Sequence, residues 1–276
     1  MENNIEIDNL LDNLIKNIEK CKITEKKEKR KPKLVIVEDF EKPKPKLVIE
    51  EEQTNKKLLT EDLGKIFEMA ICLLYETEFD GKYKYSLDEA EKLKERIKDF
   101  KKIFPNNLKH TAKGGNQYDF MDIENNIKLS AKTTKKDGKV CPQVIGQPSK
   151  KKFCQFFHLD LSLTLDQIKN YIYNNIHSLL HIYVSNTFDC PILYYNRDKD
   201  KVLFIKQINK TDWESNNIEF SHIKKNKIWN ESTCISINNI TIGEFQVHNH
   251  RDNIKFRWCF ENLLLLCKDD YEIIEL

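Results

Sequence analysis

The chain has 276 residues, of which 39% are hydrophobic and 33% are charged, and its formal net charge is +2. This length and hydrophobic content suffice for one large domain, and the near balance of charge excludes a strongly basic protein whose overall charge attracts nucleic acid. Any nucleic-acid surface must therefore be a local patch. No apolar run approaches the ~18 residues of a membrane span, and the start "MENNIEIDNL" lacks the regions of a signal peptide. With eight Cys and no CxxC pair, we expect a soluble, intracellular protein (cytoplasmic or nuclear) with reduced thiols and no membrane partner.

Residues 1–58 differ in composition from the rest of the chain. The first twenty residues have an amphipathic pattern that predicts an isolated helix. A charge-dense stretch follows, with a small duplication: "KPKLVIVE" from Lys31 and "KPKLVIEE" from Lys44. Two interpretations stay open, a disordered tail with a slipped repeat and a pair of peptides that add strands to a partner's sheet edge.

The folded domain is predicted to cover residues 59–276. "TEDLGKIFEMAICLLYE" predicts an amphipathic helix that Thr60 caps, with Glu68 at the edge of its apolar stripe. "SLDEAEKLKERIKDFKKIF" predicts a second helix, up to Phe104, with a capping box of Ser86 and Glu89. The expected buried residues of the two helices are Leu63, Phe67, Ala70 and Leu74, then Ala90, Leu93, Ile97, Phe100 and Phe104.

The second half of the domain is predicted to contain a long helix and then strands. "LTLDQIKNYIYNNIHSLLHIYVS" starts with a Thr164/Gln167 capping box and is expected to form one continuous helix. Beyond Pro191 the pattern is mostly that of strands. The order helix, helix, hairpin, helix, strands predicts an α+β fold with a central mixed β-sheet flanked by helices.

The stretch "GGNQYDFMDIENNIKLSAKTTKK", residues 114–136, is predicted to form a β-hairpin with a two-residue Asn125-Asn126 turn. This turn places Asp119 opposite Lys132 and Met121 opposite Ser130. Because alternate residues of a strand share a face, the hairpin has two different faces. One is expected to carry Asp119, Ser130 and Lys132, and the other to pack Phe120, Leu129 and Ala131.

A carboxylate and a lysine held together on a hairpin suit metal-assisted hydrolysis of a phosphodiester. The carboxylate of Asp119 can bind a hard cation such as Mg²⁺, which activates a bound water. Lys132 can orient that water or neutralise charge that develops on the phosphate. The alternative is an ordinary cross-strand ion pair.

The arrangement resembles the PD-(D/E)xK nuclease superfamily, which includes many type II restriction endonucleases. Asp119 matches the Asp, Lys132 the Lys, and Glu68 the acid of the first helix, while Ser130 replaces the first acid of (D/E)-x-K. Over roughly residues 60 to 160, the resemblance implies a restriction-endonuclease-like core and Mg²⁺ (or Mn²⁺) bound by Asp119 and Glu68. It also implies that Gln143 orients the attacking water, because a glutamine follows the Lys closely in several members.

Two further stretches are candidates for contact with DNA. "KTTKKDGKVCPQVIGQPSKKKF" carries seven Lys and almost no acid, so it either follows phosphates or is a solvated loop. In "IGEFQVHNHRDNIKFRWCF" the residues Glu244, Gln246, His248 and His250 share strand parity, which predicts a recognition hairpin or a polar sheet edge. The candidate DNA-binding residues are Lys113, Lys135, Lys136, Lys150, Gln246, His248, Arg251, Lys255 and Arg257.

Two histidine patterns are not expected to be catalytic sites. "HNH" at residues 248–250 lacks the spacing of an HNH nuclease, whose histidines lie far apart in a ββα metal fold. "HSLLH", with His177 and His181 one helical turn apart, lacks the Glu of HExxH and an obvious third ligand. Both of these residues are expected to be satisfied or surface histidines.

Together these patterns predict a Mg²⁺-dependent endonuclease that hydrolyses double-stranded DNA, restriction-type and sequence-specific, acting as a homodimer because two strands are cut. Its predicted catalytic residues are Asp119, Lys132, Glu68, Ser130 and Gln143. Two alternatives stay open. One is a catalytically inactive DNA-binding or interaction protein with a nuclease-like fold, and the other is a structure-specific repair or recombination nuclease.

Overall fold

The computed structural model describes residues 60–112, 118–136 and 138–276. The contacts divide the chain between Thr54 and Asn55, and every described residue belongs to the second unit. The predictions made for residues 1–58, which are the isolated helix and the duplicated peptide, lie outside the described residues, and so does Lys113. The predicted domain boundary at residue 59 stays a prediction.

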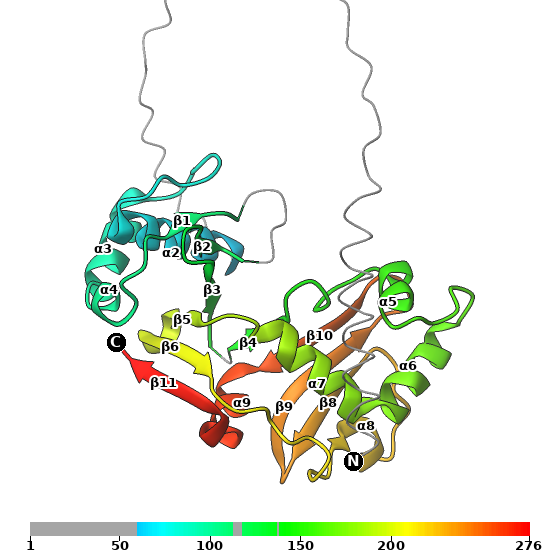
Figure 1. Cartoon of the computed structure of the whole chain (residues 1–276). Helices are drawn as coiled ribbons and strands as arrows, with labels where there is room; N and C mark the ends of the chain where they lie inside the picture. Colours follow the sequence, from blue (N-terminus) through cyan, green and yellow to red (C-terminus); the bar gives the residue numbers. More distant parts are fainter. Residues whose placement is uncertain (1–59, 113–117, 137) are drawn as a thin grey trace, which may run out of the picture. The chain divides into compact units, whose positions relative to one another are not determined.

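The described part of the chain is an α+β structure with two β-sheets (Figure 1). The first sheet has six strands in the order β1-β2-β3-β5-β6-β11, and it is mixed because β3 and β5 run parallel while the other neighbours are antiparallel. This confirms the predicted α+β class and mixed sheet. The strands are β1 (Lys109–His110), β2 (Phe120–Asp122), β3 (Ile127–Thr134), β5 (Ile192–Asn196), β6 (Lys201–Gln207) and β11 (Tyr271–Glu275).

The second sheet has five strands, all antiparallel, in the order β4-β10-β9-β8-β7. Its inward residues alternate along each strand, as expected for a sheet with one buried face. Phe256 and Trp258 of β10, for example, are fully buried, while Lys255 and Arg257 between them are half-buried. The strands are β4 (Lys139–Val140), β7 (Glu219–Phe220), β8 (Ser232–Ile237), β9 (Ile240–Val247) and β10 (Ile254–Cys259).

The two helices that Ser86 and Thr164 were predicted to cap begin where expected, but both end early. Ser86 Oγ accepts the N–H of Glu89, and the Thr164/Gln167 capping box is present. The helices are α2 (Thr60–Tyr75), α3 (Leu87–Arg96), α4 (Phe100–Ile103), α5 (Lys150–Phe156), α6 (Leu165–Asn174), α7 (Ile176–Thr187), α8 (Ser221–Lys224) and α9 (Phe260–Leu266). Short 3₁₀ turns cover Arg197–Lys199 and Lys268–Asp270.

The predictions of one helix up to Phe104 and of one long helix after Thr164 were wrong. The first breaks at Ile97 and the second at Asn175, where φ is −105° and −120°. At the second break, the Asn175 side-chain amide donates to the carbonyl of Tyr171 at 2.8 Å. An Asn that bonds to nearby backbone groups favours the end of a helix over its interior.

The six-stranded sheet separates two hydrophobic cores. One core lies between α2, α3 and the face that carries Phe120 and Leu129, and it contains all the apolar residues that the first two predicted helices were expected to bury. The other core lies on the opposite face, where Ile192 and Tyr194 of β5 pack with α6, α7, α9 and the second sheet. Consecutive residues of β3 and β5 therefore point into different surroundings.

The chain connects the two sheets directly after β3. Thr134 ends β3, and five residues later β4 pairs with β10 at the edge of the second sheet. The crossing depends on Gly138, whose φ is +55° and where a Cβ would lie 2.8 Å from the Tyr194 hydroxyl. A side chain there would be strained and would clash, so glycine is required. β3 and β10 are thus held close together.

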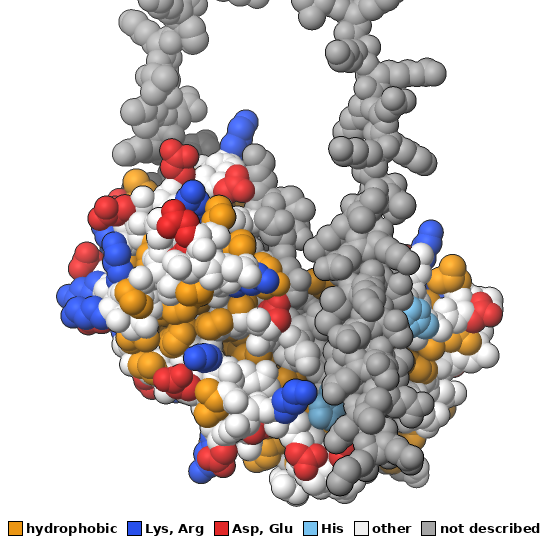
Figure 2. Space-filling model, in the orientation of Figure 1, with side chains coloured by type: hydrophobic (Ala, Val, Ile, Leu, Met, Phe, Trp, Pro, Cys, Tyr) orange, Lys and Arg blue, Asp and Glu red, His pale blue; other side chains and the backbone are white. Residues whose placement is uncertain are grey.

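The surface carries both signs of charge. On the part of the face that Figure 2 draws in colour, Lys and Arg side chains are interspersed with Asp and Glu side chains. This agrees with the near-zero net charge and leaves a local patch as the way to attract a polyanion. None of the described helices has the length and apolarity needed to cross a membrane.

Candidate active site

The β2–β3 hairpin forms, but with a different turn and register from those predicted. Met121 pairs with Lys128 and not with Ser130, so the predicted pairing was wrong by two residues. A shift of two preserves the alternation of faces. Phe120 and Leu129 therefore pair with each other, and both are fully buried in the core beside α2, as predicted.

The cause of the shift is Asp122, whose side chain builds a longer turn. Its Oδ1 accepts the N–H groups of Glu124 and Asn125 at 3.1 Å each, and its Oδ2 accepts the Asn125 side-chain amide at 2.9 Å. These bonds favour a four-residue turn in which only Asn126 has a positive φ, of 52°. They also lower the pKa of Asp122, because they outweigh the opposing effect of burial.

Asp119 and Lys132 meet on the hairpin. Asp119 lies just before β2, and its Oδ2 accepts the backbone N–H of Ala131 at 2.8 Å. Lys132 Nζ lies 3.4 Å from the same oxygen. The backbone contact fixes the carboxylate beside β3, while both side chains stay about one-fifth exposed. The pair is therefore positioned by the fold and still reached by solvent.

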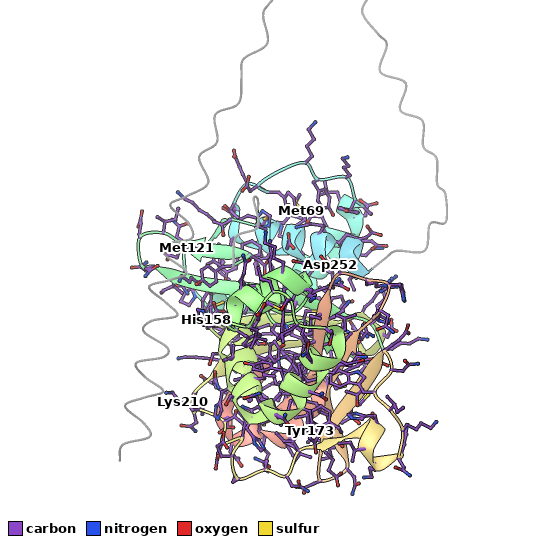
Figure 3. The ribbon with its side chains drawn as sticks, turned by 90° about the vertical axis from the view of Figure 1, so that its right-hand side faces the viewer. Met69, Met121, His158, Tyr173, Lys210 and Asp252 are labelled. Carbon is purple, nitrogen blue, oxygen red and sulfur yellow. The ribbon has the colours of Figure 1, made fainter. Side chains whose placement is uncertain are left out.

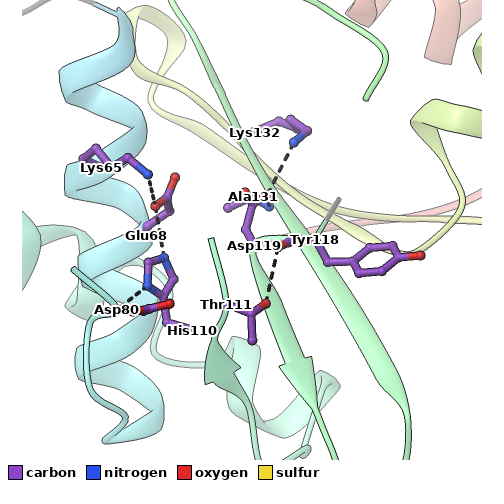
Figure 4. A network of polar contacts seen from close by, with 9 residues as sticks. All are labelled: Lys65, Glu68, Asp80, His110, Thr111, Tyr118, Asp119, Ala131 and Lys132. Carbon is purple, nitrogen blue, oxygen red and sulfur yellow. Dashed lines mark hydrogen bonds and ion pairs between the residues drawn. The ribbon is translucent and has the colours of Figure 1, made fainter. Parts of the chain in front are cut away.

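Glu68 takes part in a different network, shown in Figure 4. Its Oε2 lies 2.7 Å from Lys65 Nζ and 3.1 Å from His110 Nε2. His110 Nδ1 accepts the backbone N–H of Asp80 at 2.9 Å, so the ring proton is on Nε2 and is donated to Glu68. Burial raises the pKa of Glu68, but the contacts with His110 and Lys65 outweigh it and lower the pKa overall.

β3 lies between Glu68 and Lys132. α2 packs on the face of β3 that carries Ala131 and Thr133, because a Cβ on Gly64 would be 3.6 Å from Thr133 Oγ1. Glu68 is one helical turn beyond Gly64 and shares that side. Lys132 alternates with Ala131 and Thr133 along β3, so it belongs to the opposite face, and Figure 4 shows the two side chains on opposite sides of the strand.

Ser130, at the position of the absent acid, is buried in a polar cluster. Its Oγ accepts a hydrogen bond from Gln143 Nε2, and it also hydrogen-bonds the Cys190 thiol. Burial raises the pKa of Cys190 to about 12, so this thiol stays protonated. The structure thus brings Gln143 to β3, where it contacts Ser130.

A carboxylate that the sequence patterns did not indicate lies on the Lys132 face. Asp189 precedes β5, which runs parallel to β3 with Ser130 opposite Ile192. The Asp189 side chain interacts with Lys132, Lys128, Cys190 and Tyr118. Asp189 is an exposed residue, and partial burial of its carboxyl group raises its pKa, against the lowering effects of Lys128 and these other groups. The only local signal for Asp189 was an acid just before a strand.

Four residues of the predicted recognition hairpin lie on β9 and β10. Gln246 pairs with Lys255, and Glu244 with Arg257, so all four share the outer face of β9 and β10. Glu244 holds Arg257 at 2.6 Å and Gln246 at 3.2 Å. Burial raises the pKa of Glu244, but hydrogen bonds from Lys139, Arg257 and Gln246 lower it overall.

Cys141 lies near charged residues of both β3 and β10. The charges of Lys255, Arg257 and Lys132 all act on its thiol, although burial still raises the pKa of Cys141. The thiol of Cys141 therefore lies within electrostatic range of charged residues on both β3 and β10.

The remaining candidates occupy loops and helix ends. His248 and Arg251 lie in the loop after β9, so the prediction that His248 and His250 continue the strand was wrong. The strand stops because the chain turns, and the N–H of Arg251 bonds the carbonyl of His248 at 3.4 Å. Lys135 and Lys136 follow β3, with the N–H of Lys136 on Asp198 Oδ2 at 3.0 Å.

Lys150 and the two histidines of α7 are the remaining residues with a prediction from the sequence. Lys150 begins α5, and its N–H bonds the carbonyl of Asp252 at 3.0 Å. His177 and His181 are partly exposed and lie 3.8 and 3.9 Å from Glu214. Burial lowers the pKa of His181, against the nearby charge of Glu214. These two are surface histidines, as expected.

The chain was compared with known proteins. It is 49% identical, over 217 residues, to a protein named type II restriction enzyme CviAII from Paramecium bursaria Chlorella virus 1. The matched region covers 78% of this chain and 63% of the relative, so the chain spans less than two-thirds of that protein's length. No family model and no solved structure matches the chain.

Proposed function

We propose that the chain is a metal-dependent endonuclease that cuts double-stranded DNA at specific sequences. The observation that carries this proposal is the 49% identity to a protein named as a type II restriction enzyme, together with the Asp119–Lys132 pair on β3. The arrangement of these two residues also supports the PD-(D/E)xK superfamily as the origin of the site.

The donor set of the Lys132 face fits a hard divalent cation. Asp119 lies 3.4 Å from Lys132, and the charge of Lys132 also acts on Asp189. Both side chains offer carboxylate oxygens, the ligands that Mg²⁺ and Mn²⁺ prefer. Oδ2 of Asp119 already bonds Ala131 and Lys132, so we assign Oδ1 to the cation. A bound cation would polarise the scissile phosphate and acidify a water molecule.

In this proposal Asp189 supplies the carboxylate that Ser130 does not. Glu68, the residue expected from the sequence to be the second ligand, lies on the other side of β3 and is held by Lys65 and His110. Its assignment to the metal stays a prediction, and the geometry favours Asp189. Glu68 then acts in stability, by tying α2 to β1.

The other polar groups have roles that follow from their positions. Lys132 Nζ neutralises the charge that develops on the phosphate and orients the attacking water. Gln143, through its contact with Ser130, lies close enough to position a water beside Lys132. Lys255 and Arg257, near the same face, contact the duplex, where Arg and Gln can bind guanine and adenine edges.

Purified protein, incubated with long duplex DNA and Mg²⁺, tests the proposal. Discrete fragments are expected from the wild type and from Lys92→Ala, an exposed lysine on α3, but none from Lys132→Ala. Binding without cleavage by the wild type would favour the inactive DNA-binding protein. A smear or junction-specific nicks would favour a structure-specific nuclease.

We also propose that two copies act together, because a duplex has two strands to cut and the described part of each chain carries one such site. Sedimentation of the protein, alone and with a duplex, measures this directly. A monomer on DNA that still makes double-strand breaks would overturn the proposed homodimer without affecting the endonuclease proposal.

A further inference from the structure

A cluster of two histidines and one glutamate lies away from the proposed active site. Glu231 directly precedes β8, and His248 and His250 lie in the loop between β9 and β10. One potential ligand atom of each lies within 4.8 Å of the other two, and this is the only such group of three among the described residues. Neither the proposed activity nor the relative's name assigns it a role.

The distances in this cluster match the spacing of ligands around one metal ion. His248 Nδ1 lies 3.2 Å from Glu231 Oε2, and His250 Nδ1 lies 3.6 Å from Glu231 Oε1. A tetrahedral zinc with bonds of about 2.0–2.1 Å separates its ligand atoms by about 3.3–3.4 Å. Both observed distances are close to this separation, and they join the two imidazoles to different oxygens of the Glu231 carboxylate.

The approach of His248 to Glu231 is not a normal hydrogen bond. His248 Nδ1 is buried and close to the carboxylate, but the two groups are not aligned as donor and acceptor. Two ligands that bind a common cation approach each other in this way, since each directs a lone pair at the ion and not at its neighbour. This second observation points to a ligand between them.

The backbone around the cluster is fixed before any ion binds. The Val247 N–H donates to the Glu231 carbonyl at 2.8 Å, so the start of β8 lies beside the end of β9. The loop then turns through Asp252, labelled in Figure 3, whose carbonyl accepts the N–H of Lys150 at the start of α5. Glu231 and His248 thus flank the paired ends of β8 and β9, which reduces the entropy lost on binding.

We propose that Glu231, His248 and His250 bind a zinc ion that braces the β9–β10 loop. Two imidazoles and one carboxylate suit zinc, whereas magnesium prefers oxygen ligands alone. A water fills the fourth position, because Glu231 and His250 are exposed. The bound ion ties the loop, with Arg251 on it and Lys255 at its base, to the start of β8.

Titration of the chelator-treated full-length protein with Zn²⁺, in excess Mg²⁺, tests this proposal without DNA. One zinc per chain is expected, and X-ray absorption of the zinc protein should give only N or O ligands at about 2.0–2.1 Å. His250→Ala should weaken binding on the order of 100-fold. His250 is 64% exposed, so the variant is expected to fold, which circular dichroism checks.

His181→Ala is the matched control, because His181 is also a partly exposed histidine beside a glutamate. It should bind zinc as the wild type does, and so should Asp119→Ala, which separates this site from the proposed nuclease metal. Three outcomes would overturn the proposal: no zinc binding, sulfur among the ligands, or equal affinity in wild type and His250→Ala. Preferential binding of Fe²⁺ over Zn²⁺ would overturn the choice of metal.

Discussion

The two sides of β3 carry polar groups of different kinds. On the α2 side, the carboxylate of Glu68 is bound by Lys65 and His110, and the His110 side chain is fully buried. On the other side, Asp119 and Lys132 are one-fifth exposed, with Asp189 also in electrostatic contact. Buried groups that hydrogen-bond each other, such as Glu68 and His110, stabilise a fold. Charged groups that solvent reaches, such as Asp119 and Lys132, can instead bind a cation and a phosphate.

The comparison teaches that the residue type alone does not identify a catalytic carboxylate. Glu68 and Asp189 are both acids near the hairpin, and burial opposes ionisation of both. Glu68 has compensating contacts that lower its pKa overall, while the pKa of Asp189 stays raised. A divalent cation bound near Asp189 would favour its ionised form and lower its pKa.

The largest expected effect is that of Lys132→Ala. Removing a cation that stabilises the transition state should lower the single-turnover cleavage rate about 10³-fold, while duplex binding stays within a few-fold of the wild type. Quench-flow cleavage and fluorescence anisotropy measure the two quantities. Cleavage at more than one-tenth of the wild-type rate would remove Lys132 from the mechanism.

Asp189→Asn and Glu68→Gln test directly which of the two acids is the second metal ligand. We expect Asp189→Asn to lower cleavage about 10²-fold, with a higher Mg²⁺ concentration at half-maximal rate, because a metal ligand is lost. Glu68→Gln should change the rate less than about threefold, since it lies on the other side of β3. The reverse pattern would return the second-ligand role to Glu68.

Lys255→Ala tests whether β10 contacts DNA in addition to the Lys132 face of β3. Loss of one phosphate contact should weaken duplex binding about tenfold and reduce the salt slope of binding by about 1. Binding isotherms at several salt concentrations measure both changes. Lys92→Ala, on α3, is the matched control, and an equal effect in the two variants would indicate nonspecific electrostatics only.

The smallest expected effect is on stability, from Glu68→Gln. A folded-state pKa below the ordinary value stabilises the fold above about pH 4.5, and this contribution is lost as pH falls through the folded pKa. The variant should therefore lose about 1 kcal/mol of unfolding free energy at neutral pH, and the difference from wild type should shrink below pH 4. Urea unfolding at the two pH values measures this; a constant difference would contradict the ionic role.

Local patterns predicted much of the fold and part of the site. The starts of α3 and α6 follow from Ser86 and Thr164 followed by apolar residues at helical spacing, and the opposite faces of the hairpin follow from alternation. The exact register of the hairpin did not follow from the sequence pattern, because the side chain of Asp122 builds a longer turn than the predicted Asn125-Asn126 turn. The predicted faces of the hairpin were still correct, because a shift by two residues keeps each side chain on the same face.

What the sequence determined by itself was therefore the class of elements and the Asp119–Lys132 pair, since both depend on residues close together in the chain. Only the tertiary structure shows which acids lie on each side of β3, and on this basis we propose Asp189 as the acid that joins that pair. Asp189 reaches the Lys132 face through the parallel pairing of β3 and β5, whose connection passes through three helices. Glu68 lies on the other side because α2 buries its apolar stripe there. Contacts of this range depend on how whole elements pack, which no local periodicity encodes.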